Sequence, residues 1–259
     1  MQISNYEGFL IKNGNSTKVE DTLVVEAALQ ININNEPYTV VMRSPGDDFE
    51  LVRGLLFAED IYKQKEKLAF EIVEVKENGF SIINVTISKE NLGKGYLNKR
   101  TLLSVSSCGI CGKQKLEDIT VNGNKLTNNF NFDFHKIEEM FIKMKEQQNT
   151  FELSGGSHAA ALFDKNYNVL DVKEDIGRHN AVDKVIGQLL KNNSLQKANC
   201  LLVSGRVSYE IISKAFIAKI SYVIAVSACS SLAVDFAKEF GICLIGFSRG
   251  KKATLYSKI

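Results

Sequence analysis

Two cysteines separated by two residues, Cys108 and Cys111 in the segment SSCGICGK, are the residues of this sequence best suited to chemistry. This spacing brings two sulfurs close together, which suits half of a zinc site, a redox dithiol or a sulfur relay. Glycines follow both cysteines and leave the backbone open to a bulky donor or acceptor. Lys113 and Lys115 favour the thiolate, which is the nucleophile. These features favour sulfur transfer over structural metal binding.

A zinc site is the main alternative for this pair. A structural zinc needs two more Cys or His ligands at a compact spacing, and Cys200, Cys229 and Cys243 form no second pair of this kind. Cys200 and Cys243 stand in apolar runs, where we expect them in the core, and Cys229 follows such a run. A hydrolytic zinc deaminase would need His-x-Glu and Pro-Cys-x-x-Cys, and the sequence has neither. We therefore exclude hydrolytic deamination.

Small and basic residues follow three apolar runs in the second half of the chain. In open α/β sheets, ligands bind outside the carboxyl ends of the strands, and N–H groups at helix starts accept phosphates. Ordinary turn chemistry and an internal hydrogen-bond network are the competing explanations for these residues. The candidate cofactor-binding residues are Ser204, Gly205, Arg206, Phe247, Ser248, Arg249, Gly250, Lys251, Lys252, His158, Arg178 and His179.

The elements that must position these residues differ between the two halves. Residues 19–100 alternate in short strand-like runs with turns at Asn34-Asn35 and Gly79, and one helix is expected at 47–62. In the second half, apolar strands alternate with helices expected at 134–147, 178–190, 208–218 and 231–240, which predicts a mostly parallel sheet covered on both faces. We predict an α/β protein with a small mostly-β domain at 1–103, a loop region with the cysteine pair at 104–133 and an α/β cofactor-binding domain at 134–259.

Bulk properties narrow the possible partners. The chain has 259 residues with 32 basic and 30 acidic side chains, a balance that gives no reason to expect a nucleic-acid partner. We find neither an apolar run of membrane-spanning length nor a secretory signal, and the five cysteines do not form the dense, even set of a secreted scaffold. We therefore expect a cytoplasmic protein without a membrane partner.

Several segments together resemble the FdhD family of formate dehydrogenase accessory sulfurtransferases: SSCGICG, SGGSHAAALFD, EDIGRHNAVDKVIG, VSGRVSYEIISKA and GFSRG. The resemblance runs from about Ser44 to the C-terminus. It implies a cytidine-deaminase-like three-layer C-terminal domain without deaminase chemistry, a smaller α+β N-terminal domain and a homodimer. It also implies that persulfide sulfur passes from a cysteine desulfurase to the substrate cofactor bis-molybdopterin guanine dinucleotide. The cofactor is then inserted into formate dehydrogenase. GDP is expected to be a mimic of this cofactor.

The same resemblance assigns roles to individual residues. Cys108 would carry the persulfide with Cys111 as its partner, and residues 247–252 would contact the cofactor. The family's Ser-Ala-Pro-Thr reads Ser-Ala-Cys-Ser at 227–230, and losing the proline makes this loop less rigid. We expect a sulfurtransferase in which the Cys108 thiolate attacks a donor persulfide. The alternatives are a non-catalytic molybdenum-cofactor chaperone whose thiols are ligands, and a zinc-stabilised binding protein.

Overall fold

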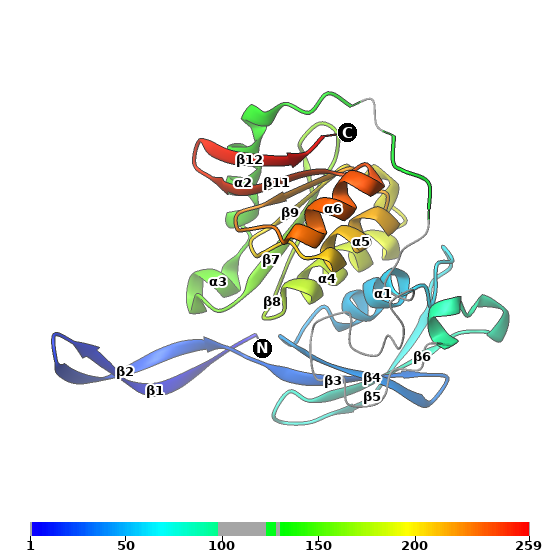
Figure 1. The fold of residues 1–259 in the computed structure, drawn as a ribbon. Coiled ribbons are helices and arrows are strands. Elements are labelled where there is room, and N and C mark those ends of the chain that lie inside the picture. Colours follow the sequence, from blue (N-terminus) through cyan, green and yellow to red (C-terminus); the bar gives the residue numbers. More distant parts are fainter. Residues whose placement is uncertain (1, 98–122, 128–129, 259) are drawn as a thin grey trace.

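The computed structural model describes residues 2–97, 123–127 and 130–258 (Figure 1). Cys108 and Cys111 lie outside the described residues. We call residues 27–97 the N-terminal lobe and residues 130–258 the C-terminal lobe, and a long hairpin precedes both. No helix in the described ranges is long and apolar enough to cross a membrane.

The N-terminal lobe is a sheet covered by one helix. Its four strands have the order β4-β3-β6-β5, and its elements are β3 (Ala27–Ile33), β4 (Glu36–Arg43), α1 (Asp48–Ala58), β5 (Ala69–Val75), β6 (Ser81–Thr86) and the short 3-10 helices η1 (Lys89–Asn91) and η2 (Lys94–Leu97). Alternate residues of β3 are buried, because one face of a half-buried strand points into the core. The expected turn at Asn34-Asn35 joins β3 to β4, with left-handed φ angles of 54° and 68°. Leu51 and Leu56 of α1 share an apolar core with Leu29 of β3.

The C-terminal lobe contains a mixed sheet. Its six strands have the order β12-β11-β10-β9-β7-β8 and span β7 (His158–Phe163), β8 (Val169–Asp175), β9 (Cys200–Val203), β10 (Tyr222–Ala225), β11 (Cys243–Arg249) and β12 (Lys252–Ser257). Strands β9, β10 and β11 are parallel, whereas β7 is antiparallel to both neighbours and β12 is antiparallel to β11. Our prediction of a mostly parallel sheet was wrong here, because the short turns after β7 and β11 permit only antiparallel pairing. The predicted mixture of helices and strands is confirmed.

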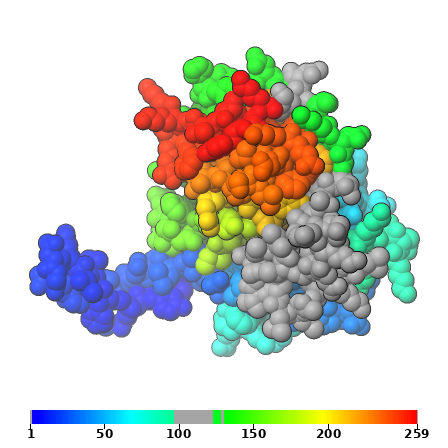
Figure 2. Space-filling model, viewed as in Figure 1, coloured from blue at the N-terminus to red at the C-terminus, as the bar shows by residue number. Residues whose placement is uncertain are grey.

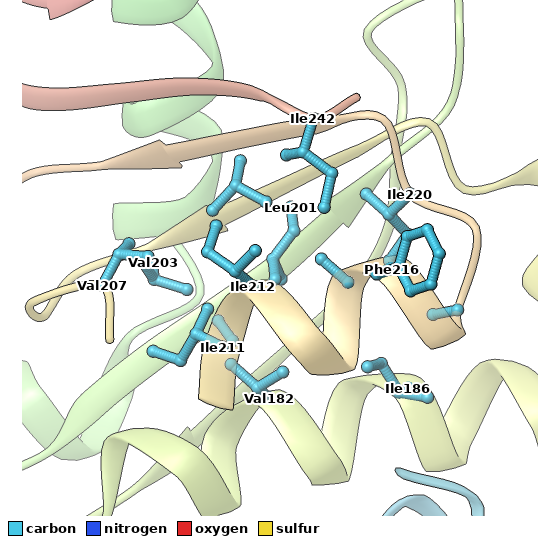
Figure 3. Packing of buried hydrophobic residues seen from close by; sticks show 14 of the residues in the cluster. Val182, Ile186, Leu201, Val203, Val207, Ile211, Ile212, Phe216, Ile220 and Ile242 are labelled. Atoms are coloured by element: carbon cyan, nitrogen blue, oxygen red, sulfur yellow. The ribbon is translucent and has the colours of Figure 1, made fainter. Parts of the chain in front are cut away.

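Helices cover both faces of this sheet (Figure 1). On one face lie α4 (Arg178–Lys191), α5 (Tyr209–Ile217) and α6 (Ser231–Phe240). Figure 3 shows Val182 of α4 and Ile212 of α5 packed towards Leu201 of β9. On the other face, α2 (Ile137–Lys145) places Met140 in a core with Cys200 and Cys243, so the expected burial of both cysteines is confirmed. The remaining short helices are η4 (Phe134–Lys136), α3 (Asn149–Ser154) and η5 (Leu195–Lys197).

The end of the loop region predicted at 104–133 packs against the sheet. Phe132 is buried and stacks on Tyr222 of β10 at a centroid distance of 4.8 Å. The Tyr222 hydroxyl donates to the Phe130 carbonyl oxygen at 2.7 Å. The aromatic side chains therefore hold the end of this stretch on the sheet, beside α2.

A close crossing of α1 and α4 joins the two lobes. A Cβ atom added to Gly54 would lie 2.0 Å from the carbonyl oxygen of Asp183, and one added to Gly187 would lie 1.9 Å from that of Glu50. Only glycine fits at such positions, because any side chain would collide with the facing backbone. The two helices therefore touch backbone to backbone.

A buried ion pair strengthens the same junction. Asp175, at the end of β8, and Lys184 of α4 are fully buried, with 2.8 Å between Oδ2 and Nζ. Ser44, just after β4, donates its backbone N–H to Asp175 and accepts from Lys184 Nζ at 2.9 Å through its carbonyl oxygen. Asn180 donates to the Met42 carbonyl oxygen at 2.7 Å. The end of β4 is thus fixed to the start of α4.

The chain begins with a hairpin that the sequence did not predict. Strands β1 (Ile3–Lys12) and β2 (Asn15–Val24) pair antiparallel along their whole length and project away from both lobes (Figure 1). Among the strand-like runs predicted within 19–100, the apolar run at 21–33 is interrupted at Val25-Glu26. The first part of that run therefore belongs to the hairpin and the second part to β3.

Candidate functional site

A pocket of about 620 Å³ lies where the parallel strands of the C-terminal lobe end. We call it the main pocket. Its polar wall comes from the ends of β9 and β11, the start of β7 and the preceding glycines, and its apolar wall comes from α2 and α3. The lining residues are Glu138, Phe141, Ile142, Met144, Lys145, Gln148, Phe151, Gly155, Gly156, Ser157, His158, Ser204, Val226, Ser248, Arg249 and Gly250. The carboxyl ends of the parallel strands β9, β10 and β11 thus meet at one pocket.

A bulge in β11 shapes the polar wall. The pairing of β11 with β12 shifts between Gly246 and Arg249, and Phe247 adopts a left-handed φ of 51°. Such bulges re-aim side chains and are common beside functional sites. Ser248 is consequently only 5% exposed, and its Oγ has no hydrogen-bond partner among the described residues. A buried hydroxyl at a pocket wall costs free energy unless a ligand satisfies it, so Ser248 fits a polar ligand.

Two further side chains on this wall are held by the backbone. Arg249 Nε donates to the Val226 carbonyl oxygen at 3.1 Å, which holds the guanidinium at the edge of the pocket. Ser204 Oγ accepts from the backbone N–H of Ala159 at 2.9 Å, and its own O–H can then donate to a ligand. The polar wall therefore presents hydroxyl donors beside a positive charge, an arrangement that suits phosphate oxygens.

Positive charge gathers around His158 at the same end of the sheet. A Cβ atom on Gly205 would lie 3.1 Å from His158 Nδ1 and 3.5 Å from Arg178 Cβ, so this glycine lets the two side chains approach. Burial lowers the pKa of His158, as do the charges of Arg178 and Arg206, whereas Asp175 partly opposes them. His158 is therefore neutral at pH 7, while the two guanidinium groups keep the region attractive to anions.

His179 lies in a separate polar network rather than among the lining residues. It is buried, and its Nε2 is 3.0 Å from Ser208 Oγ and 3.7 Å from Glu210 Oε2. Burial raises the pKa of Glu210, but the hydrogen bond from Ser208 and the nearby His179 and Arg178 lower it overall. This placement matches the internal hydrogen-bond network that the sequence left open as an explanation.

A second pocket of about 670 Å³ adjoins the main pocket, and both are lined by Glu138 and Gly250. Lys251 and Lys252 lie here beside Leu255 of β12, together with aromatic and apolar residues from η4 and α2. The structure therefore divides the predicted segment 247–252 between two pockets. Phe247 is half exposed and is not among the described lining residues of either pocket.

The apolar wall of the main pocket was missed by sequence reasoning. Phe151 belongs to α3, a helix too short to give a periodic signal. Ile142 was available as a sequence signal, because it is apolar although it lies off the helix face formed by Ile137, Met140 and Met144, and the structure leaves it exposed. With Phe141, these residues form a surface suited to a planar ring.

The loop at 227–230, where Cys229 replaces the expected proline, is held by backbone hydrogen bonds. Val207 donates to the Ala228 carbonyl oxygen and Phe247 donates to that of Ser227, each at 3.0 Å. Burial raises the pKa of Cys229 to about 11, so its thiol is protonated at neutral pH. Within the described ranges, no three His, Cys, Asp or Glu side chains are grouped to hold a metal ion.

Comparisons with known proteins add evidence independent of this geometry. A family model described as FdhD/NarQ matches residues 24–259. The chain is 36% identical to the sulfur carrier protein FdhD of Streptomyces avermitilis, with 95% of this chain and 91% of the relative covered. It is 40% identical to the sulfur carrier protein FdhD of Picrophilus torridus, with 92% of this chain and 91% of the relative covered. A solved structure described as a formate dehydrogenase accessory protein of Desulfotalea psychrophila shares the fold, with a TM-score of 0.77, 21% identity, and 99% of this chain and 97% of that chain covered.

Proposed function

Because this chain belongs to the FdhD/NarQ family, whose relatives named above are sulfur carriers, we propose that it carries persulfide sulfur for a formate dehydrogenase. In this proposal a cysteine desulfurase supplies the sulfur and Cys108 carries it. The recipient is bis-molybdopterin guanine dinucleotide, bound at the main pocket before its insertion into the dehydrogenase. The observation that carries the binding step is the buried, unsatisfied hydroxyl of Ser248 at the pocket wall.

The sulfur steps follow thiol exchange chemistry. The Cys108 thiolate attacks the terminal sulfur of the donor persulfide, the donor S–S bond breaks, and the donor leaves as a thiolate. Cys108 then holds the persulfide. Attack of the Cys111 thiolate on the Cys108 sulfur releases hydrosulfide and leaves a Cys108–Cys111 disulfide, so the two thiols supply the electrons that reduce the carried sulfur. A cellular dithiol must afterwards reduce this disulfide before the next cycle.

The described residues support binding of a nucleotide cofactor through their polar groups, their charge and their apolar surface. Ser204 and Ser248 offer hydroxyl donors to phosphate oxygens, and Arg249 offers charge. Arg178 and Arg206 add positive potential. The apolar wall of α2 and α3 suits a planar heterocycle, and the adjoining second pocket with its two lysines gives room for a second nucleotide half. The two pockets are thus compatible with a large cofactor that carries several phosphates.

We also propose that the C-terminal lobe has a cytidine-deaminase-like three-layer arrangement. This is supported by its mixed sheet, in which β7 runs against its neighbours, and by helices on both faces. The expected domain limits and the cytoplasmic location stay part of the proposal. Deaminase chemistry is not part of it, since the required His-x-Glu is missing from the sequence.

Binding of GDP by isothermal titration tests the pocket. Arg249→Ala should weaken GDP binding by about 10- to 100-fold, since it removes a charge-assisted contact. Lys238→Ala on α6 removes the same charge outside the lining residues and should bind GDP like the wild type. Equal affinity of Arg249→Ala and Lys238→Ala would contradict the assignment of the pocket.

Mass spectrometry tests the relay. After incubation with a cysteine desulfurase and cysteine, the wild type should gain roughly 32 Da, one sulfur atom, and Cys108→Ala should not. A Cys108→Ser variant that still restores formate dehydrogenase activity would instead favour a chaperone whose thiols are ligands. Stoichiometric zinc in the purified chain would favour a zinc-stabilised binding protein.

A further inference from the structure

Helix α3 forms part of the apolar wall of the main pocket, yet its own residues do little to hold it in place. It has six residues, and isolated helices shorter than about 12–15 residues are marginal in water. Within it only Thr150 is buried, whereas Phe151 is 43% and Leu153 is 60% exposed. Figure 2 shows the segment around α3, in light green, at the surface between the blue hairpin and the red C-terminal strands. The helix therefore depends on an anchor from another element.

The carboxylate of Glu174, the penultimate residue of β8, supplies this anchor. Its Oε2 accepts from the backbone N–H of Thr150 and its Oε1 accepts from that of Phe151, both at 2.8 Å. These N–H groups belong to the first turn of α3, where the helix itself has no acceptors to offer. Hydrogen bonds to an ionised acceptor are roughly twice as strong as neutral ones. One buried side chain thus fixes the start of the helix.

The same carboxylate also holds the chain after the helix. The Ser157 hydroxyl is buried and donates to Glu174 Oε1 at 2.6 Å. Between the two attachment points, Gly155 takes a left-handed φ of 65°, which lets the chain reverse. Glu174 is itself fixed by the sheet, because it pairs with Ala159 of β7. Both ends of the segment 150–157, which carries Phe151 and other lining residues of the main pocket, are therefore attached to the sheet through one side chain.

We propose that Glu174 is a positioning residue that holds Phe151 where it can stack on the planar ring of a bound nucleotide. The proposal rests on the proposed function, which assigns this ring to the apolar wall. Both carboxylate oxygens of Glu174 already accept hydrogen bonds from its own chain, so it acts through Phe151 rather than by contact with the ligand. Stacking on an aromatic side chain tolerates little displacement of the ring, so loosening α3 weakens nucleotide binding.

Isothermal titration with GDP tests this role. Glu174→Gln keeps the size of the side chain but replaces one acceptor by an NH₂ group, and it should weaken GDP binding about 10-fold. Phe151→Ala should have a similar effect, and adding Glu174→Gln to Phe151→Ala should change the affinity by less than about 2-fold, since both act on one contact. The effects of Glu174→Gln and Arg249→Ala should multiply, because Arg249 belongs to the polar wall. The control Glu152→Gln removes the same charge at an exposed position of α3 and should bind GDP like the wild type.

Amide hydrogen exchange followed by mass spectrometry tests the anchor without a ligand. In Glu174→Gln, the peptide that covers residues 148–157 should exchange about 10-fold faster or more, while the rest of the chain exchanges like the wild type. Ser157→Ala keeps Glu174 and removes one donor, so it should speed exchange in the same peptide by a smaller factor. It is the second variant should Glu174→Gln lower the stability of the whole chain.

Three results would each overturn the inference and leave the pocket assignment standing. They are unchanged exchange at 148–157 in both variants, GDP binding by Glu174→Gln with the affinity of the wild type, and multiplied effects of Glu174→Gln and Phe151→Ala. Faster exchange throughout the chain with equal losses of affinity in every background would also overturn it, since that result describes a merely structural role. A wild-type chain that does not bind GDP would reject the pocket assignment and the inference together.

Discussion

Replacing Asp175 by alanine should destabilise the folded chain by about 4 kcal/mol. The carboxylate is fully buried, and its Oδ2 lies 2.8 Å from Lys184 Nζ. It also accepts from the backbone N–H groups of Ser44 at 3.2 Å and Gly177 at 2.8 Å, and from Asn180 Nδ2 at 2.9 Å. One side chain therefore connects the end of β4 to the start of α4, where Arg178 and His179 are positioned.

The magnitude follows from the charge that the substitution leaves behind. Lys184 stays fully buried, and its remaining contacts are the carbonyl oxygens of Ser44 at 2.9 Å and Glu174 at 3.4 Å. Removing one partner of a buried pair costs about 3–5 kcal/mol, because neutral acceptors compensate the ammonium only in part. The exposed pair of Lys18 and Glu7 is the contrast, and Lys18→Ala should cost less than about 1 kcal/mol.

Urea unfolding followed by circular dichroism measures this difference, since the chain has no tryptophan to serve as a fluorescence probe. Asp175→Ala should lower the unfolding midpoint by more than about 1 M, and Asp175→Ala with Lys184→Met should recover most of the loss. The double variant is informative because it removes the uncompensated charge together with its partner. A single variant as stable as Lys18→Ala, or a double variant no better than the single one, would refute the reasoning.

Three further predictions address the junction, the pocket and the thiols. Gly54→Ala should destabilise the chain by more than about 2 kcal/mol in the same unfolding assay, whereas Gly8→Ala, which meets nothing within 4 Å, should change little. Folding lowers the pKa of His158, so the neutral side chain contributes its full stability above pH 6.5, and this contribution is lost as the pH falls through the pKa of the folded state. His158→Gln should therefore lose less Tm than the wild type on acidification. Burial raises the pKa of Cys229 and of Cys243 to about 11, so mass spectrometry should find both alkylated by iodoacetamide at pH 7.5 far more slowly than N-acetylcysteine.

Sequence periodicity was sufficient for the four longer helices of the C-terminal lobe, α2, α4, α5 and α6, but not for the short α3. The expected helix at 231–240 coincides with α6, and the one at 178–190 ends one residue before α4 does. These helices bury a continuous apolar stripe, which is the property that periodicity detects. The helix expected at 47–62 ends at Ala58 instead, because the chain turns at Asp60 with a φ of 58°.

The sequence does not show locally which strands pair with each other, nor that β1 and β2 form a projecting hairpin. An apolar run has the same appearance whether its neighbour is parallel or antiparallel, so the direction of β7 was not visible in AAALFD. The hairpin of β1 and β2 reads as a mixture of polar and apolar residues, because neither of its faces is buried by the described part of the chain.

The candidate site was predictable in its polar half only. Ser204 follows β9, and Ser248 and Arg249 are the last two residues of β11, so the rule that ligands bind at carboxyl ends of strands was enough to select them. The bulge that turns Ser248 inward depends on the pairing of β11 with β12, and the apolar wall depends on how α2 and α3 pack. Both are tertiary features, so residue types and spacing could not reveal them.

The glycine crossing between α1 and α4 limits how this chain can be dissected. A fragment beginning at residue 134 would lose α1 and expose a strip of bare backbone on α4 around Gly187. It would also lose Ser44, whose carbonyl oxygen accepts from the buried ammonium of Lys184. Such a fragment would unfold or aggregate rather than report on the pocket, so nucleotide and sulfur measurements have to be made on the intact polypeptide.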